Sequence, residues 1–155
     1  MRLYLVRHGE AVGELVDPDR PLSETGIREA QRTARFISGN LRASVGSIQH
    51  SPKARAAQTA RIMAEHLAPV GGTKQTDGLL PMDDPGIWTD RVSGINLDTM
   101  LVGHLPHLSG MASTLLCWNP ETEIVQFNTA TAACLEGAAG NWYLKWLVGA
   151  DILKE

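Results

Sequence analysis

The chain has few of the features that mark several large classes of protein. Its 155 residues include only two cysteines, Cys117 and Cys134, which lie far apart and lack the close spacing of a metal site. We therefore expect two buried, reduced thiols in a cytoplasmic protein. No apolar run is long enough to cross a membrane, and Arg7 interrupts the N-terminal apolar stretch too early for a signal peptide.

Positive charge is not in excess either. The 14 lysines and arginines are outnumbered by 17 aspartates and glutamates, which gives a formal net charge of −3. This balance argues against non-specific nucleic-acid binding, which needs a basic face. The sequence has no internal repeat, low-complexity tract or linker, and 43% of its residues are hydrophobic. We therefore expect residues 1–155 to form a single domain with a sizeable core, for which a monomer is a compatible state.

The apolar residues that are present follow two periodicities. Steps of three and four residues predict amphipathic helices, and short apolar runs bounded by turn residues predict strands. The predicted strands span 2–7, 45–50, 73–80 and 98–103, with two further strands and a glycine-rich turn within 131–148. One helix is predicted from Ser23 to about Asn40, with Ile27, Ala30, Ala34, Ile37 and Leu41 on its buried face. Further helices are predicted to begin at Ser51-Pro52, within 83–96 and at Pro106.

The order of these elements predicts the fold class. Strands alternate with helices and are followed by a hairpin, which is typical of an α/β three-layer sandwich. Its mixed sheet should be largely parallel, with helices on both faces and a C-terminal antiparallel hairpin at one edge. Within the hairpin, Trp142 and Trp146 lie at strand spacing, which predicts that they pack on the sheet. Sheets of this kind bind ligands at the carboxyl ends of their strands.

Charged and polar residues stand where three of the predicted parallel strands end. Arg7 and His8 stand at the end of the first strand, Ser51 follows the second, and His104 follows a later one. Since the carboxyl ends of parallel strands meet at one edge, we expect these side chains to converge. Arg55 lies in the first turn of the helix after Ser51, and helical side chains lean toward the N-terminus. Its guanidinium can therefore reach the same edge.

Two arginines and two histidines beside helix N-termini form a site for an anion, and phosphate is the natural ligand. The planar fork of arginine matches phosphate oxygens in pairs, and free backbone N–H groups add further donors. A neutral histidine can attack phosphorus while cations neutralise the equatorial oxygens. The sequence has no cluster of carboxylates of the kind that holds magnesium, so no metal and no cofactor are expected.

Four segments in a fixed order carry a family resemblance: "VRHGEA" (6–11), "RPLSETG" (20–26), "SPKARAAQTA" (51–60) and "GHLPHL" (103–108). The RHG motif alone is a weak signal, but together the segments resemble the histidine phosphatase (phosphoglycerate-mutase-like) superfamily. The length and the tail "FNTATAACLEG" (127–137) resemble its small bacterial phosphohistidine phosphatase branch. The resemblance therefore covers nearly the whole chain.

The resemblance implies roles for the residues at matching positions. His8 is the expected phosphorylated nucleophile, and the expected ligands of the phosphoryl group are Arg7, Arg55 and His104. The residues expected to contact the substrate are Arg20, at the mouth of the pocket, Ser51 and Leu105.

One departure from the superfamily and one unassigned residue stand out. Many members carry a carboxylate proton donor after the second helix, but "DGLLPMDDPGIW" (77–88) does not show that motif clearly. Asp83, Asp84 and Glu10 therefore stay open as donors, and Glu10 is better explained as a local partner for a cation. His107 extends the "GHLP" segment without an assigned role.

These observations predict a cofactor-independent phosphatase that works through a covalent phosphohistidine intermediate on His8. The expected substrate is phosphohistidine on a protein, such as a histidine phosphotransfer domain of a signalling relay, and this follows from the resemblance alone. A phosphatase of small phosphate esters is the alternative enzyme. A phosphate-dependent binding module without turnover is the alternative outside enzymes. A phosphoglycerate mutase fits less well, since it needs a clear acid–base carboxylate.

Overall fold

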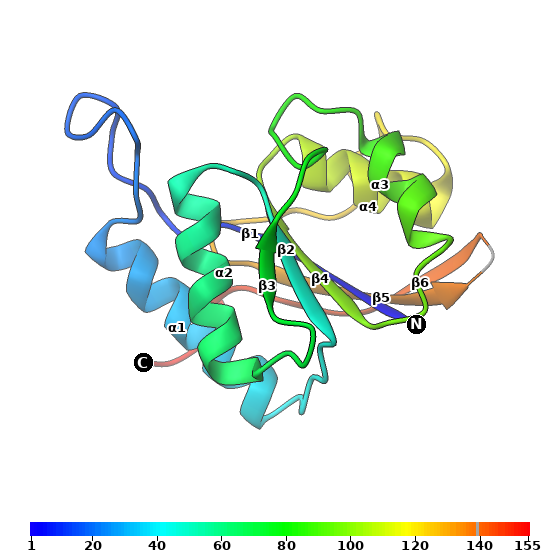
Figure 1. The fold of residues 1–155 in the computed structure, drawn as a ribbon, viewed down its shortest axis with the longest axis horizontal. Coiled ribbons are helices and arrows are strands. Elements are labelled where there is room, and N and C mark those ends of the chain that lie inside the picture. Colours follow the sequence, from blue (N-terminus) through cyan, green and yellow to red (C-terminus); the bar gives the residue numbers. More distant parts are fainter. Residues whose placement is uncertain (139) are drawn as a thin grey trace.

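A mixed sheet forms the middle layer of the molecule, with the strand order β3-β2-β4-β1-β5-β6 (Figure 1). The computed structural model describes residues 1–138 and 140–155, so residue 139 of the predicted glycine-rich turn lies outside the described residues. The strands are β1 (Arg2–Arg7), β2 (Ser47–His50), β3 (Thr73–Gln75), β4 (Thr99–Gly103), β5 (Ala132–Ala138) and β6 (Asn141–Val148). Strands β1 to β4 pair in parallel, whereas β5 and β6 pair antiparallel. The predicted sheet and hairpin are confirmed.

Helices cover both faces of this sheet. They are α1 (Glu24–Gly39), α2 (Ala54–Leu67), α3 (Pro85–Val92) and α4 (His107–Cys117). Helices α1 and α2 lie on one face, and α3 and α4 lie on the other (Figure 1). A short 3-10 helix, η1 (Ala150–Ile152), contacts α1 near the end of the chain. The predicted three-layer sandwich is confirmed.

The residues of β1 alternate between two hydrophobic cores, as the two-residue period of a strand requires. Tyr4 and Val6 lie in the core beneath α1 and α2, whereas Leu3 and Leu5 lie in the core beneath α3 and α4. All four side chains are fully buried. Because β1 lies between β4 and β5 in the sheet, the residues that follow it start from a rigid element.

Helix α1 begins where it was predicted to begin. The Ser23 hydroxyl accepts a hydrogen bond from the Gly26 N–H at 3.0 Å and caps the first turn. The predicted buried face is correct for the middle of the helix but wrong for Ile27, which is 39% exposed. The first turn packs through Gly26 against the backbone of Glu10, so Ile27 faces solvent instead.

The predicted start of the second helix at Ser51-Pro52 is wrong. Helix α2 begins at Ala54, and Lys53 occupies the cap position without a side-chain hydrogen bond. The Ser51 hydroxyl accepts from the N–H of Lys53 at 3.4 Å, before the helix begins, and is also bonded to Nε2 of His104 at 2.5 Å. The hydroxyl therefore joins the residue before the helix to His104, and the helix begins two residues later than the local pattern predicts.

The C-terminal hairpin contains a β-bulge. Cys134 pairs with Trp146 and the next residue, Leu135, pairs with Leu144, so one extra residue of β6 lies between the two pairs. Trp142 therefore packs on the core beneath α3 and α4, and Trp146 packs on the core beneath α1 and α2. Both side chains pack on the sheet as predicted, but a regular strand would have placed them on the same face.

Two smaller expectations are partly wrong. Cys134 is buried as predicted, whereas Cys117 is only partly buried because it lies in the last turn of α4. Strand β3 is shorter than predicted, since the chain leaves the sheet after Gln75 and Leu79 enters the core beneath α3 and α4. In the part of the chain that the structure describes, no helix combines the length and the apolar character needed to span a membrane.

Candidate active site

Three loops converge at the carboxyl ends of the parallel strands, as predicted. The N–H of His8 donates to the carbonyl oxygen of Gly103 at 3.1 Å, which brings together the residues that follow β1 and β4. The N–H of Ser51 donates to the carbonyl oxygen of Val102 at 3.2 Å and ties the loop after β2 to the same place. The His8 and His104 rings lie with their centroids 5.0 Å apart.

His8 is held with one ring nitrogen protonated and the other unprotonated. Its Nδ1 lies 2.7 Å from the carbonyl oxygen of Gly9, which can only accept, so Nδ1 carries the ring proton. Its Nε2 is then unprotonated and accepts from Nε of Arg55 at 3.3 Å. Burial is the main cause that lowers the pKa of His8 to about 4, and nearby arginine charges act in the same direction. At neutral pH His8 is therefore a neutral imidazole beside a cation.

Arg7, Arg20 and Arg55 form a cluster of cations around His8. Among the described residues none of the three makes an ion pair, although the charge of Glu29 acts on Arg7 from beyond ion-pair distance. Nη1 of Arg7 donates to the carbonyl oxygen of Phe127 at 2.8 Å, which fixes its guanidinium. Burial lowers the pKa of Arg7 and of Arg55. A cluster of this kind is suited to bind an anion with several oxygens.

Arg20 reaches the site from the loop between β1 and α1. Its Nε donates to the carbonyl oxygen of Val12 at 3.2 Å, and its backbone has a positive φ of 47°. Its charge helps to lower the pKa of both His8 and Arg55. Arg20 therefore lies close enough to His8 for its charge to act there, and its expected place at the mouth of the pocket stays a prediction.

His104 is the second buried histidine of the site. Its Nε2 is bonded to the Ser51 hydroxyl, and its buried Nδ1 has no partner within the described residues. Burial, followed by the charges of His8 and Arg55, lowers the pKa of His104 to about 3. Ser51 thus lies at the site with its hydroxyl on His104, and Leu105 is partly buried against the core beneath α3 and α4.

Two glycines allow the loop after β1 to pass directly over the start of α1. A Cβ on Gly9 would lie 2.5 Å from the carbonyl oxygen of Gly26, and a Cβ on Gly26 would overlap the backbone of Glu10. The N–H of Gly9 donates to the Thr59 hydroxyl at 3.1 Å, and that hydroxyl donates to the carbonyl oxygen of Arg55 at 2.8 Å. Thr59 therefore fixes this loop to α2. The sequence prediction missed it, although it belongs to the "SPKARAAQTA" segment.

Residues of α1 and of the 127–137 tail also hold the site residues in place, and these contacts were not predicted from the sequence. The carbonyl oxygen of Phe127 holds Arg7. Glu29 accepts from the N–H of Glu10 at 3.0 Å and from the Thr129 hydroxyl at 3.1 Å, so it joins α1 to the loop after β1 and to the tail. The only signal for these contacts in the sequence is the resemblance of the "FNTATAACLEG" tail.

The carboxylates considered as proton donors all have other partners. Asp84 caps α3, and Asp83 accepts from the N–H of Leu80 at 2.8 Å. Glu10 accepts from the Ser23 hydroxyl at 2.7 Å, so its local partner is a hydroxyl group and not the expected cation. Among the residues described, no group of three or more His, Cys, Asp or Glu side chains is arranged to hold a metal ion.

His107 lies in the first turn of α4 and is 1% exposed. Neither of its ring nitrogens has a hydrogen-bond partner in the described part of the chain. Burial lowers its pKa, against the opposing charges of Asp83 and Asp84. The sequence assigned it no role, and the structure shows that it is a core residue beside the site.

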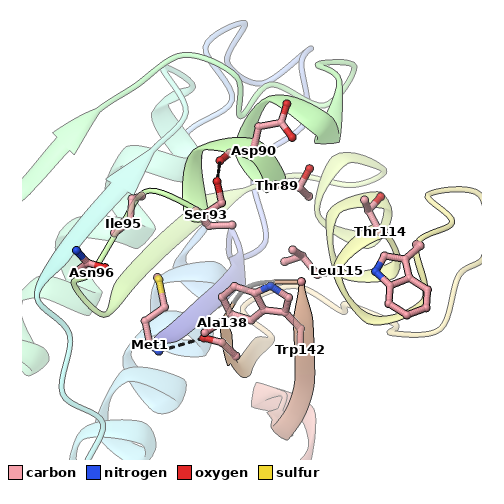
Figure 2. A pocket seen from close by; sticks show the side chains of 14 residues that line it. Met1, Thr89, Asp90, Ser93, Ile95, Asn96, Thr114, Leu115, Ala138 and Trp142 are labelled. Carbon is pink, nitrogen blue, oxygen red and sulfur yellow. Dashed lines mark hydrogen bonds between the residues drawn. The ribbon is translucent and has the colours of Figure 1, made fainter.

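A separate pocket of about 400 Å³ lies beside the start of β1 and the hairpin (Figure 2). Much of its apolar wall comes from Met1, Leu115, Trp118 and Trp142. Polar side chains of Thr89, Asp90 and Ser93 border it (Figure 2). None of the residues around His8 lines this pocket, so it is distinct from the arginine and histidine cluster.

The fold and the site together define a class of protein. The model of the histidine phosphatase superfamily (branch 1) matches residues 3–89, which is more than half of the chain, and the chain belongs to this superfamily. It is a phosphatase, as the sequence predicted. No curated protein sequence matches the chain.

Solved structures with the same fold include phosphatases of several kinds. The protein histidine phosphatase SixA, complexed with tungstate, has a TM-score of 0.87 at 22% identity, with 99% of this chain and 100% of that chain covered. The alpha-ribazole phosphatase from Shigella flexneri has a TM-score of 0.80 at 17% identity, with 100% of each chain covered. A phosphoserine phosphatase from Entamoeba histolytica has a TM-score of 0.72 at 18% identity, with 94% of this chain and 95% of that chain covered. These likenesses confirm the predicted fold.

Proposed function

We propose that this phosphatase hydrolyses phosphohistidine and that His8 is transiently phosphorylated. The observation that carries the proposal is the state of His8. Its Nδ1 donates to Gly9, and its Nε2 keeps a lone pair that points toward Arg55. A neutral nitrogen among cations is suited to attack a phosphoryl group, because the cations neutralise the equatorial oxygens.

In the first half-reaction, Nε2 of His8 forms a bond to phosphorus, and the bond from phosphorus to the leaving nitrogen of the substrate breaks. The leaving imidazole takes the electron pair of that bond and departs as a neutral ring when its other nitrogen carries a proton. The phosphorylated His8 is then a cation, whose Nδ1–H keeps its hydrogen bond to Gly9. Arg7 and Arg55 bind the phosphoryl oxygens in this step.

In the second half-reaction, a water oxygen forms a bond to phosphorus and the bond from phosphorus to Nε2 breaks. His8 takes the electron pair and returns to its neutral form, and the proton lost by the water stays with the phosphate product. We assign His104 to the phosphoryl site, because the centroid of its ring lies 5.0 Å from that of His8 and its Nε2 is bonded to the Ser51 hydroxyl. Arg20 and Leu105 are assigned to the entrance, where the leaving group lies.

The choice of phosphohistidine depends on its leaving group. An alkyl phosphate releases an alkoxide unless an acid protonates it, and a positioned general acid contributes about 10²–10⁴-fold to the rate. Asp83, Asp84 and Glu10 are engaged in other hydrogen bonds in this chain. An imidazole leaving group needs less help, because its conjugate acid has an ordinary pKa of about 6.5.

We propose further that a protein carries the phosphohistidine, in the manner of a histidine phosphotransfer domain in the cytoplasm. A protein histidine phosphatase is among the structures that share the fold. An alpha-ribazole phosphatase and a phosphoserine phosphatase share it too, so a small phosphate ester is the alternative substrate. A binding module without turnover is disfavoured by the complete set of Arg7, His8, Arg55 and His104.

The test is a substrate panel measured as initial rates of phosphate release. We expect phosphohistidine to be cleaved fastest, an aryl phosphate next, and sugar or glycerate phosphates most slowly. Trapping of an acid-labile radiolabel on the wild type, and its absence from His8→Ala, should identify the intermediate. Cleavage of alkyl phosphates as fast as phosphohistidine would move the assignment to a general phosphatase, and a label that is bound but never released would indicate a binding module.

A further inference from the structure

The loop between β1 and α1 carries two apolar side chains that no other described residue covers. Leu15 and Val16 are 104% and 78% exposed, although large aliphatic residues are the ones most often found inside proteins. The two are adjacent at the tip of the 12–21 loop. This loop, drawn in blue, projects from the body of the molecule beside the start of α1 (Figure 1).

Backbone hydrogen bonds within the loop hold this tip outward. The N–H of Val12 donates to the carbonyl oxygen of Pro21 at 2.9 Å and closes the base of the loop. The N–H groups of Val16 and Asp17 donate to the carbonyl oxygen of Gly13, at 3.0 and 3.1 Å, and form the turn at the tip. The loop is thus ordered by its own backbone without burying its apolar side chains.

The same loop leads into the phosphate site. Arg20, whose charge acts on His8, donates from its Nε to the carbonyl oxygen of Val12. Leu15 is three residues from Val12, so its Cα lies within about 11 Å of that residue. We do not expect a small phosphorylated compound between the arginines to reach the exposed tip, whereas a folded protein that carries a phosphorylated side chain has surface around it that can contact the tip.

The charges of the loop indicate what that surface is like. Glu14, Asp17 and Asp19 flank the apolar tip, and Arg20 at its base is the only basic residue within 12–21. Acidic side chains around an apolar contact favour a partner whose apolar patch has a rim of lysine or arginine. The arginine cluster binds the phosphoryl group of the same partner.

We propose that Leu15 and Val16 form a docking contact for the protein that carries the phosphohistidine, at an apolar patch with a basic rim. This inference depends on the proposed function. The contact makes the loop tip a determinant of substrate class, because protein-borne phosphohistidine gains binding energy from it and free phosphohistidine does not.

The test compares the double variant Leu15→Ser/Val16→Ser with the wild type on two substrates. The protein probes are histidine phosphotransfer domains from the same genome, phosphorylated on histidine, and the small probe is free phosphohistidine. We expect kcat/KM for the best domain to fall at least about tenfold, since burying one such side chain is worth that much. The value for free phosphohistidine should stay unchanged. Val70→Ser, which removes a 100% exposed valine between α2 and β3, is the matched control and should alter neither value.

The outcomes separate the docking contact from the proposed function. Equal losses on both substrates, no loss on either, or a wild type that cleaves free phosphohistidine but none of the domains would overturn the docking contact. Cleavage of neither substrate by the wild type would overturn the proposed function instead. A wild-type dimer in sedimentation that the double variant abolishes would show that the tip binds a second copy of the chain, and would also overturn the inference. Glu14→Lys should lower kcat/KM for the domain, and high salt should reduce that difference.

Discussion

The buried histidines of the site should make the protein less stable in acid, and the contribution of one of them can be isolated. The pKa of His8 is about 4 in the folded chain, against about 6.5 for an exposed histidine. Between these values the unfolded state binds a proton that the folded state does not bind. The contribution of His8 therefore lowers the free energy of unfolding as the pH falls below about 6.5, and this loss is complete below about pH 4.

The size of the effect follows from the interval that the pH crosses. Of the range from pH 8 to pH 5, only the part below the unfolded-state pKa of about 6.5 counts, which is about 1.5 pH units. Each of these units lowers the free energy of unfolding by about 1.4 kcal/mol. His8 alone should therefore remove about 2 kcal/mol over this range. His104, whose pKa is about 3, adds a loss of similar size. Total stabilities of about 5–15 kcal/mol make such losses easy to measure.

The assay is urea unfolding of the wild type, His8→Gln and His66→Gln at both pH values. His66 is exposed in the last turn of α2 and provides the matched control. We expect the loss of unfolding free energy between pH 8 and pH 5 to be about 2 kcal/mol smaller in His8→Gln than in the other two proteins. Equal losses in all three proteins would refute the argument, since His8 would then titrate alike in the folded and unfolded states.

The remaining predictions concern the chemistry. His8→Ala should lower the rate of turnover by several orders of magnitude. The circular dichroism spectrum should stay unchanged, since the residue lies at a strand end. A folded variant with a near-wild-type rate would exclude His8 as the nucleophile. Arg55→Lys keeps the charge but loses the planar fork, so kcat should fall at least about tenfold and inhibition by tungstate should weaken; unchanged kinetics would place Arg55 outside the site. Treatment with EDTA should leave the rate unchanged, because arginines bind the phosphoryl group; a loss that magnesium restores would contradict this. Asp83→Asn should keep phosphate release from phosphohistidine within about twofold of the wild type, and loss of all activity would identify this carboxylate as a proton donor.

The convergence of the site residues could be predicted because it depends on strand order. Arg7 ends β1, and His8, Ser51 and His104 each follow a strand of the parallel part of the sheet, whose strands end at one edge. Local sequence patterns are sufficient to place those strands. The reach of Arg55 follows equally from a local rule, the lean of helical side chains toward the N-terminus.

The contacts that could not be predicted join distant parts of the chain. Thr59 and the carbonyl oxygen of Phe127 bond to residues that are 50 and 120 positions away in the sequence. No local pattern specifies such pairs, and a backbone carbonyl oxygen is common to every residue type. Ser51 shows the same limit, since the local pattern predicted a helix cap, whereas its hydroxyl bonds to Lys53 before the helix and to His104, 53 positions away.

The extra residue in β6 lets this edge strand place one tryptophan side chain on each of the two hydrophobic cores. Trp142 packs against the core beneath α3 and α4, whereas Trp146 packs against the core beneath α1 and α2. The ring centroids of Trp146 and Tyr4 lie 5.9 Å apart. Each indole is therefore an optical reporter of a single layer. Two variants that each keep one of these indoles, with Trp88, Trp118 and the other indole replaced by phenylalanine, would give separate fluorescence signals for the layer that holds Arg55 and for the layer that holds His107.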